Sequence, residues 1–146
     1  MTQLPRPYLI SEGQFTLPAN YHDRTVNAFV PVTPAPAMNV SRDYLATGED
    51  AAAYLTRQLD QLIPHMQGWL QHLREPVELG NGLLTGEIIH ISFLRENARI
   101  AQMQAIFALD SVRVLVFSIS KMGEITAAES KLLRDMLSSF RFHDAG

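Results

Sequence analysis

Hydrophobic residues recur with a period near two in the first 45 residues, which predicts β-structure there. Residues 8–10 and 14–17, separated by Ser11-Glu12-Gly13, are typical of a hairpin. Residues 24–30 carry β-branched and aromatic side chains suited to a half-buried strand, and 38–41 is a further short strand. Prolines between the last two strands predict a break, because proline donates no ladder hydrogen bond.

The period then becomes helical. Residues 47–50, Thr-Gly-Glu-Asp, have the spacing of a capping box, so a helix is expected to begin at Ala51 and to end or kink at Pro64. A narrow apolar arc at about 100° per residue runs along this helix. It contains Ala51, Leu55 and Leu62, with Met66 nearby if the helix continues past Pro64.

After this helix the period returns to two, and a second helix closes the chain. Residues 69–79, 83–94, 98–109 and 112–119 predict four strands joined by short links, which indicates an antiparallel meander. Thr126-Ala-Ala-Glu129 is a second capping box. The helix after it carries Leu132, Leu133, Met136, Leu137 and Phe140 at helical spacing.

These elements predict an α+β fold in a single domain over residues 1–146. The main elements follow the order βββ-α-ββββ-α, as a mostly antiparallel twisted sheet with helices packed on one face. The meander strands, however, are apolar on both faces. The second face therefore needs a cover, which is the first helix, a second subunit or a bound apolar ligand.

Glutamines interrupt these apolar surfaces. Gln58 projects from the centre of the helical arc, and Gln102 and Gln104 share one face of the strand 98–109 with apolar neighbours. Two interpretations are open. The amides bond to nearby backbone groups inside a core, or they line a groove that accepts a hydrophobic helix and bonds its polar atoms.

Composition narrows the chemistry. The chain has a formal net charge of −3 and no cysteine, so a nucleic-acid stripe, a disulfide framework and a thiolate metal site are not expected. The five histidines show no metal-ligand spacing, and no nucleophile or phosphate-loop motif is present. We expect no metal, no cofactor and no enzyme activity. The start lacks the features of a secretory signal and no stretch is long enough to span a bilayer, so a cytoplasmic protein is expected.

Several segments together resemble a known family. They are 10–18 (Ile-Ser-Glu-Gly-Gln-Phe-Thr-Leu-Pro), 22–29 (His-Asp-Arg-Thr-Val-Asn-Ala-Phe), 38–43 (Met-Asn-Val-Ser-Arg-Asp), 55–59 (Leu-Thr-Arg-Gln-Leu) and 137–142 (Leu-Ser-Ser-Phe-Arg-Phe). In wording and order they resemble the DcrB-like domain, and within it the Eag chaperones of type VI secretion effectors.

The resemblance implies a function. Eag chaperones are cytoplasmic homodimers that hold the N-terminal transmembrane helices of PAAR-containing effectors, often with Rhs repeats, and deliver them to the VgrG spike. The partner is then the hydrophobic N-terminal region of a PAAR/Rhs effector, in complex with VgrG or not, with no nucleic acid and no insertion of the chaperone into the membrane.

The same resemblance assigns the site. Gln58 and Gln102 match the family's client-binding glutamines, and Gln104 keeps the second assignment open. The expected groove walls are Leu62, Met66, Val26, Ala28, Val40, Ser41 and Ile100.

Two other function classes stay open. One is a small-molecule or lipid-binding domain that uses the same apolar groove. The other is an enzyme whose site is assembled in space, for which a deep pocket joining His90 or His22 to a carboxylate would be the sign.

Overall fold

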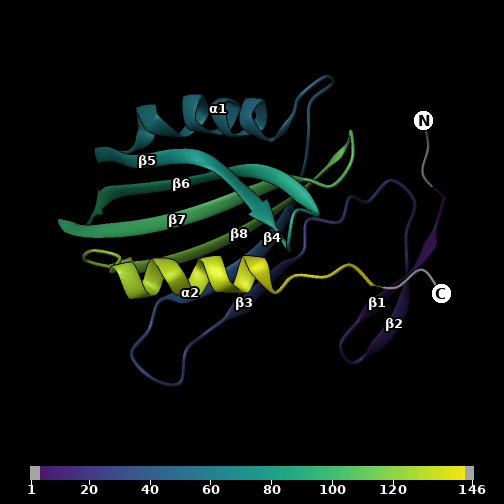
Figure 1. Ribbon diagram of the computed structural model, residues 1–146. Helices are drawn as coiled ribbons and strands as arrows, with labels where there is room; N and C mark the ends of the chain where they lie inside the picture. The colour runs from purple at the N-terminus through teal and green to yellow at the C-terminus, as the bar shows by residue number, and fades with distance from the viewer. Residues whose placement is uncertain (1–3, 144–146) are drawn as a thin grey trace.

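The computed structural model describes residues 4–143 and contains two antiparallel sheets and two α-helices (Figure 1). A small sheet pairs β1 (Arg6–Ile10) with β2 (Gly13–Leu17). The large sheet has six strands in the order β3-β4-β8-β7-β6-β5. Its strands are β3 (Val26–Phe29), β4 (Ala37–Tyr44), β5 (Gln67–Leu79), β6 (Leu84–Arg95), β7 (Ala98–Ala108) and β8 (Arg113–Met122). The helices are α1 (Ala51–Leu62), continued by a 3₁₀ turn over Ile63–His65, and α2 (Ala127–Ser138).

The α+β class and the antiparallel meander β5 to β8 are confirmed. The order βββ-α-ββββ-α is wrong in its first part, since four strands precede α1. The predicted hairpin 8–10 and 14–17 is present, but it forms its own sheet. Strands β3 and β4 instead join the large sheet beside β8, a long-range pairing that local periodicity does not encode.

The two helices lie on opposite faces of the large sheet (Figure 1). Helix α1 packs on a cluster that includes Ile89, Ile91 and Phe93 of β6. Helix α2 packs, through Leu133 and Leu137, on a cluster from the alternate residues of the same strands. The prediction that both helices share one face is therefore wrong. The physical reason is the apolar content of both faces, each of which needs a cover.

Local caps explain where the helices begin. Asp50, rather than Thr47, is the N-cap of α1, and its carboxylate accepts from the Ala53 amide at 2.8 Å. The second capping box is confirmed, because the Thr126 hydroxyl accepts from the Glu129 amide at 3.1 Å and the Glu129 carboxylate accepts from the Thr126 amide at 2.9 Å. Within residues 4–143 no helix combines the length and apolar character needed to cross a membrane.

Candidate functional site

Helix α1 covers only part of its face of the large sheet. It lies over β6 and β7, whereas Val26 of β3, on the same side, is 58% exposed. A cavity of about 410 Å³ opens between α1 and the sheet. The helix contributes Tyr54, Leu55, Gln58, Leu59, Gln61 and Leu62, and the sheet contributes Ser41, Gln104, Ile106 and Val116.

Polar contacts hold α1 at its N-terminal half. The Tyr54 hydroxyl donates to Asp43 of β4 at 2.6 Å, and the Arg74 guanidinium of β5 donates to the Ala52 carbonyl at 2.9 Å. Burial, reinforced by the neighbouring Asp43 carboxylate, raises the pKa of Tyr54 far above its usual value, so its hydroxyl stays a donor. Leu62, at the other end of α1, is 43% exposed. The C-terminal half of α1 therefore forms an open wall of the cavity.

The register of the sheet places two rows of polar side chains on the α1 face. Directly paired residues of antiparallel strands point to the same side, so each row can be followed strand by strand. One row runs Ala28, Asn39, Ser118, Gln104 and Ile89 from β3 to β6. The next runs Ala37, Ser120, Gln102 and Ile91 from β4 to β6.

The three predicted glutamine side chains are half-buried and unpaired, and a fourth, the exposed Gln61, also lines the cavity. Within residues 4–143, Gln58, Gln102 and Gln104 make no hydrogen bond from their side-chain amides, and no fully buried polar side-chain atom lacks a partner. In the interpretation that two helices cover both faces and the glutamines bond to nearby backbone groups, the first part is confirmed and the second is wrong for residues 4–143. Each amide keeps donors and an acceptor available to a bound group.

The structure gathers most of the predicted site residues on this face. Gln58, Leu62, Ser41 and Gln104 line the cavity itself. Val26 pairs with Ser41, Ala28 belongs to the polar row of Gln104, and Gln102 lies one row further along β7. Met66 and Ile100 pack at the edge of the core beneath α1.

The prediction that Val40 lines the groove with Ser41 is wrong. Val40 packs against the core on the α2 side of the sheet. Neighbouring residues of a strand point to opposite faces, so Val40 and Ser41 cannot share one wall.

Three polar residues of this face were not predicted from the sequence. Asn39, Ser118 and Ser120 extend the polar rows away from α1. The alternation Ser118-Ile119-Ser120 in an otherwise apolar strand was the available signal. Its meaning depends on the pairing of β8 with β4 and β7, which brings these hydroxyls beside Asn39 and the glutamines.

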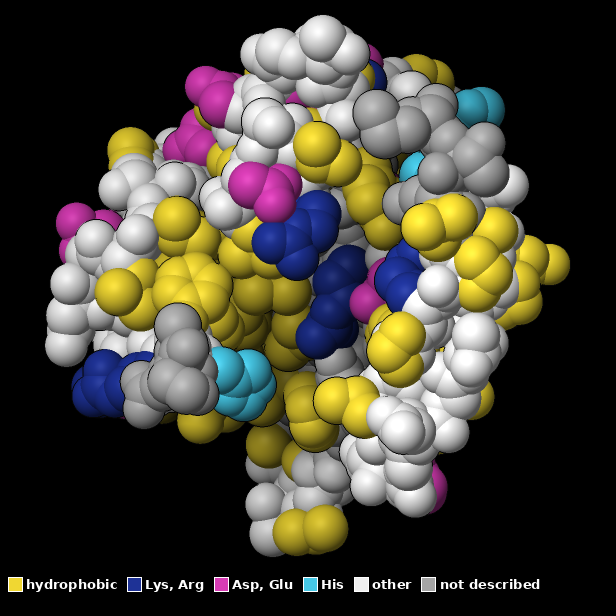
Figure 2. Space-filling view, turned by 90° about the vertical axis from the view of Figure 1, so that its right-hand side faces the viewer, with side chains coloured by type: hydrophobic (Ala, Val, Ile, Leu, Met, Phe, Trp, Pro, Cys, Tyr) yellow, Lys and Arg dark blue, Asp and Glu magenta, His cyan; other side chains and the backbone are white. Residues whose placement is uncertain are grey.

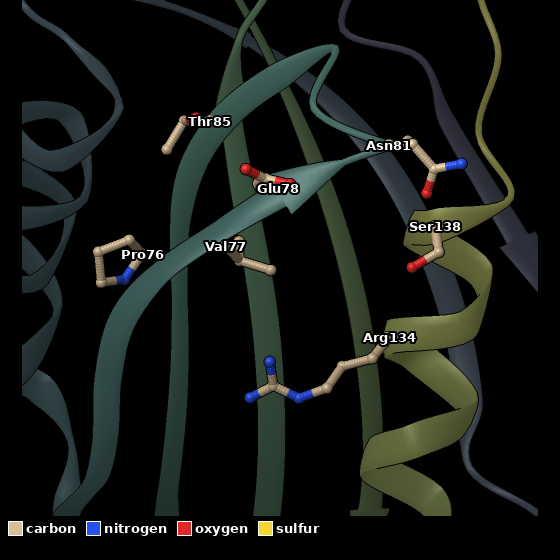
Figure 3. Close-up of a pocket in the computed structure, with 8 residues that line it drawn as sticks. Pro76, Val77, Glu78, Asn81, Thr85, Arg134 and Ser138 are labelled. Atoms are coloured by element: carbon tan, nitrogen blue, oxygen red, sulfur yellow. The ribbon is translucent and has the colours of Figure 1, made fainter.

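A larger cavity of about 590 Å³ lies on the other side of the sheet, between β5 and α2 (Figure 3). Its arginine, Arg134 of α2, extends towards β5 in Figure 3 and donates to the Glu75 carboxylate at 2.9 Å. The remaining lining side chains that Figure 3 labels are Pro76, Val77, Glu78, Asn81, Thr85 and Ser138. An ion pair thus neutralises this arginine.

The end of the molecule that carries the small sheet is also hollowed. Figure 2 shows Lys and Arg side chains gathered there in a hollow bordered by hydrophobic side chains. Arg42 and Arg113 line a cavity of about 380 Å³ with Phe140 and Phe142. Arg113 is paired with Asp110 at 2.8 Å, and Arg42 donates to Asn27 and to backbone carbonyls. These guanidinium groups are therefore committed to the fold.

The fold and the partly covered face define an α+β protein with an apolar groove beside its first helix. Residues 12–139 match the family model of DcrB, and the chain belongs to this family. A crystal structure of a Pseudomonas aeruginosa protein of unknown function, described as a candidate regulator, has the same fold: the TM-score is 0.74 at 19% identity, over 97% of this chain and 99% of that one. No curated protein matches the sequence.

Proposed function

We propose that this protein is a chaperone that shields the N-terminal transmembrane helices of a type VI secretion effector of the PAAR/Rhs class and aids its loading on the VgrG spike. The groove between α1 and the β3-β4-β8 side of the sheet is the client site. Membership of the DcrB family and the resemblance of five segments to Eag chaperones support this proposal.

The observation that carries the proposal is the presence of unpaired glutamine amides beside apolar side chains in one cavity, the apolar ones being Leu55, Leu59, Leu62, Ile106 and Val116. Gln58 and Gln104 line the cavity, and neither side chain bonds to another residue in the described part of the chain. Transmembrane helices rich in Gly, Ala and Ser present backbone carbonyls and hydroxyls to close neighbours. The glutamines match this chemistry, while Leu62 and Val26 supply apolar contact.

The driving force is sufficient for capture. A helix of about 20 residues that buries about 1,000 Å² of apolar surface gains about 25 kcal/mol before ordering and association costs. The exposed side of β3 extends the apolar surface beyond the cavity, which by itself holds only a few side chains.

We further propose that the protein acts in the cytoplasm as a homodimer, binds no nucleic acid and does not insert into the membrane. Exposed apolar residues of the small sheet and of the segment after β3 offer surface for a second copy: Leu9, Phe15, Val30 and Val32. Analytical ultracentrifugation measures this directly, and a monomer at micromolar concentration would contradict the dimer.

The experiment that tests the chaperone proposal is co-expression with the effector encoded beside this gene. The effector is expected to co-purify with this protein when its apolar N-terminal segment is present and to be lost when that segment is deleted. Capture that persists after the deletion contradicts the proposal.

A second candidate is a small-molecule or lipid-binding domain that uses the same groove. The cavity of about 410 Å³ favours it, because this volume lies in the range of small-ligand pockets. Mass spectrometry of protein purified without a client discriminates the two, since a stoichiometric lipid in the groove would support this candidate.

A further inference from the structure

A second polar cavity lies on the α2 face of the sheet, near the β5 edge. It has a volume of about 440 Å³, and its polar lining comes from β5, β6, β7 and the segment before α2. Its polar side chains are His72, His90, Ser92, Arg99 and Glu124. It faces away from the α1 groove, so a ligand in it would bind independently of the proposed client.

An irregular edge strand aims His72 into this cavity. β5 pairs with β6 through two register shifts, and the second one leaves His72 between Gln71, paired with Ile91, and Leu73, paired with His90. Such bulges redirect a side chain at the cost of ladder hydrogen bonds. The His72 ring lies 4.8 Å from the His90 ring, and its Nε2 is hydrogen-bonded to the Ser92 hydroxyl at 2.9 Å.

Arg99 adds a fixed positive charge beside the two imidazoles. Its Nη1 donates to the Ser92 hydroxyl at 3.1 Å and to the Gly68 carbonyl at 2.8 Å. Its other guanidinium nitrogens, like the ring nitrogens of His90, make no hydrogen bond with any residue between 4 and 143. Arg99 of β7 and His90 of β6, two neighbouring strands, therefore both present nitrogen atoms without hydrogen-bond partners among residues 4–143 to this cavity.

Ser92 holds His72 and Arg99 in position and does not act as a nucleophile. It is only 2% exposed, and both His72 and Arg99 bond to its hydroxyl. His90 and Glu124 line the same cavity, but no hydrogen bond joins them. A nucleophile needs access to its substrate, which a serine that is 2% exposed lacks, and no carboxylate among residues 4–143 orients the His72 ring beside it.

We propose that this cavity binds an oxyanion, the phosphate or carboxylate group of a small ligand, with Arg99, His72 and His90 as its donors. Charge-assisted hydrogen bonds to a guanidinium are the strong form of this recognition. Leu70, Ala101 and Ile125 provide an apolar surround for the rest of the ligand.

Binding is expected to depend on the protonation of His90. With His90 neutral, the charges of Arg99 and Glu124 oppose each other, and nearby Lys121 is paired with Glu129 at 3.0 Å. Burial, with the His72 charge as the lesser cause, lowers the pKa of His90 below its ordinary value. Protonation of His90 as the pH falls therefore adds positive charge to the cavity, and oxyanion affinity rises in that direction.

NMR of the imidazole resonances tests this proposal, with inorganic phosphate, acetate and chloride as probes. Phosphate or acetate is expected to shift the His72 and His90 resonances saturably. The pH comparison uses acetate, because phosphate itself gains negative charge between about pH 5.5 and pH 8, and the acetate affinity is expected to be at least about fivefold tighter at about pH 5.5. By linkage, a saturating anion raises the pKa of His90. The tighter of the two anions identifies the ligand group as phosphate or carboxylate.

Two variants and a matched control complete the test. Arg99→Gln is expected to abolish saturable binding, whereas Arg95→Gln, the same change on exposed Arg95, keeps it. His90→Gln keeps a neutral donor but removes the positive charge that the imidazole can gain, and it leaves the bonds of Arg99 and Ser92 intact, so it weakens binding at acidic pH in a folded protein. The proposal is overturned if neither anion gives a saturable shift at acidic pH, if chloride gives the same shift, or if Arg99→Gln and Arg95→Gln bind equally.

Discussion

Gln58 of α1 and Gln104 of β7 line the same cavity from opposite sides, one from the helix and one from the sheet beneath it. Neither amide is bonded to another described residue. Helix α1 is tied down at its N-terminal half by Tyr54 and Asp43, which leaves the glutamine end of the cavity beside a partly exposed helix end. Both side chains are only half-buried, and neither has a fully buried polar atom without a partner, so water can satisfy the amides until a bound group replaces it.

The glutamines are expected to act on binding rather than on folding. Gln58→Leu or Gln104→Leu should weaken capture of an apolar helix rich in Gly, Ala and Ser by about tenfold, because a client polar group is left unsatisfied at a cost of about 1–2 kcal/mol. The melting temperature should hold or rise, since no intramolecular hydrogen bond is lost. Peptide affinity and thermal unfolding by circular dichroism measure the two effects.

Gln14→Leu is the control for this pair. Gln14 is exposed on the small sheet and outside the groove, so its replacement should change neither quantity. A lower melting temperature for Gln58→Leu with unchanged peptide affinity would show that Gln58 stabilises the fold and does not bind the client.

An aspartate substituted on one face of β3 or on the other should show which face of the sheet binds the client. Val26 is 58% exposed and lies on the α1 face, while Phe29 is 53% exposed and lies on the other face. Val26→Asp is expected to abolish client capture with little loss of stability, because an ionised carboxylate opposes an apolar helix. Phe29→Asp is the matched change and should leave capture intact. Equal loss in both variants would contradict the assignment of the face.

The close approach of β6 and β7 makes Gly86 sensitive to substitution. A Cβ at this position would lie 2.0 Å from the Ile106 carbonyl oxygen and 2.7 Å from the Phe107 ring. Gly86→Ala is therefore expected to destabilise the fold by about 2–3 kcal/mol or more, as overpacking against backbone forces the strands apart. Gly13→Ala, where nothing lies within 4 Å, should be close to neutral. Urea unfolding of the two variants gives the comparison.

Asp110, in the hairpin between β7 and β8, should make the free energy of unfolding depend on pH under acidic conditions. Backbone hydrogen bonds from Arg113 and Val112, aided by the Arg113 guanidinium, lower the pKa of Asp110 from 3.8 to about 2. A depressed pKa means that the ionised carboxylate stabilises the folded state above about pH 3.8 and that this contribution is lost as the pH falls towards 2.

Asp110→Asn keeps an acceptor for the turn but does not titrate. The variant is expected to show a smaller fall in melting temperature between about pH 4 and pH 2 than the unchanged protein. Parallel pH profiles for the two proteins would contradict the role of Asp110.

Local patterns predicted the elements of this fold better than their arrangement. Short links between alternating segments indicate the meander β5 to β8, and the capping box at Thr126 marks the start of α2. The helical arc also placed Gln58 correctly beside Leu55 and Leu62. Each of these features depends on residues that lie close together in the chain, and the spacing of hydrophobic residues indicates such local features.

The arrangement of faces depends on distant pairing, and there sequence reasoning failed. Val40 and Ser41 were assigned to one wall, although adjacent strand residues alternate, and only the pairing of β4 with β8 decides which of them faces α1. The same pairing brings Ser118 and Asn39 side by side in the groove. Nothing in either local segment indicates this neighbour.

Site-specific photo-crosslinking from adjacent residues of β3 tests the client groove most directly. A photoreactive amino acid at Ala28 faces the groove, and one at Phe29 faces away from it. With the effector co-expressed, we predict crosslinks from position 28 to the apolar N-terminal segment of the effector and none from position 29. Crosslinks of equal yield from both positions, or crosslinks from position 28 to an effector that lacks the segment, would contradict the groove as the client site.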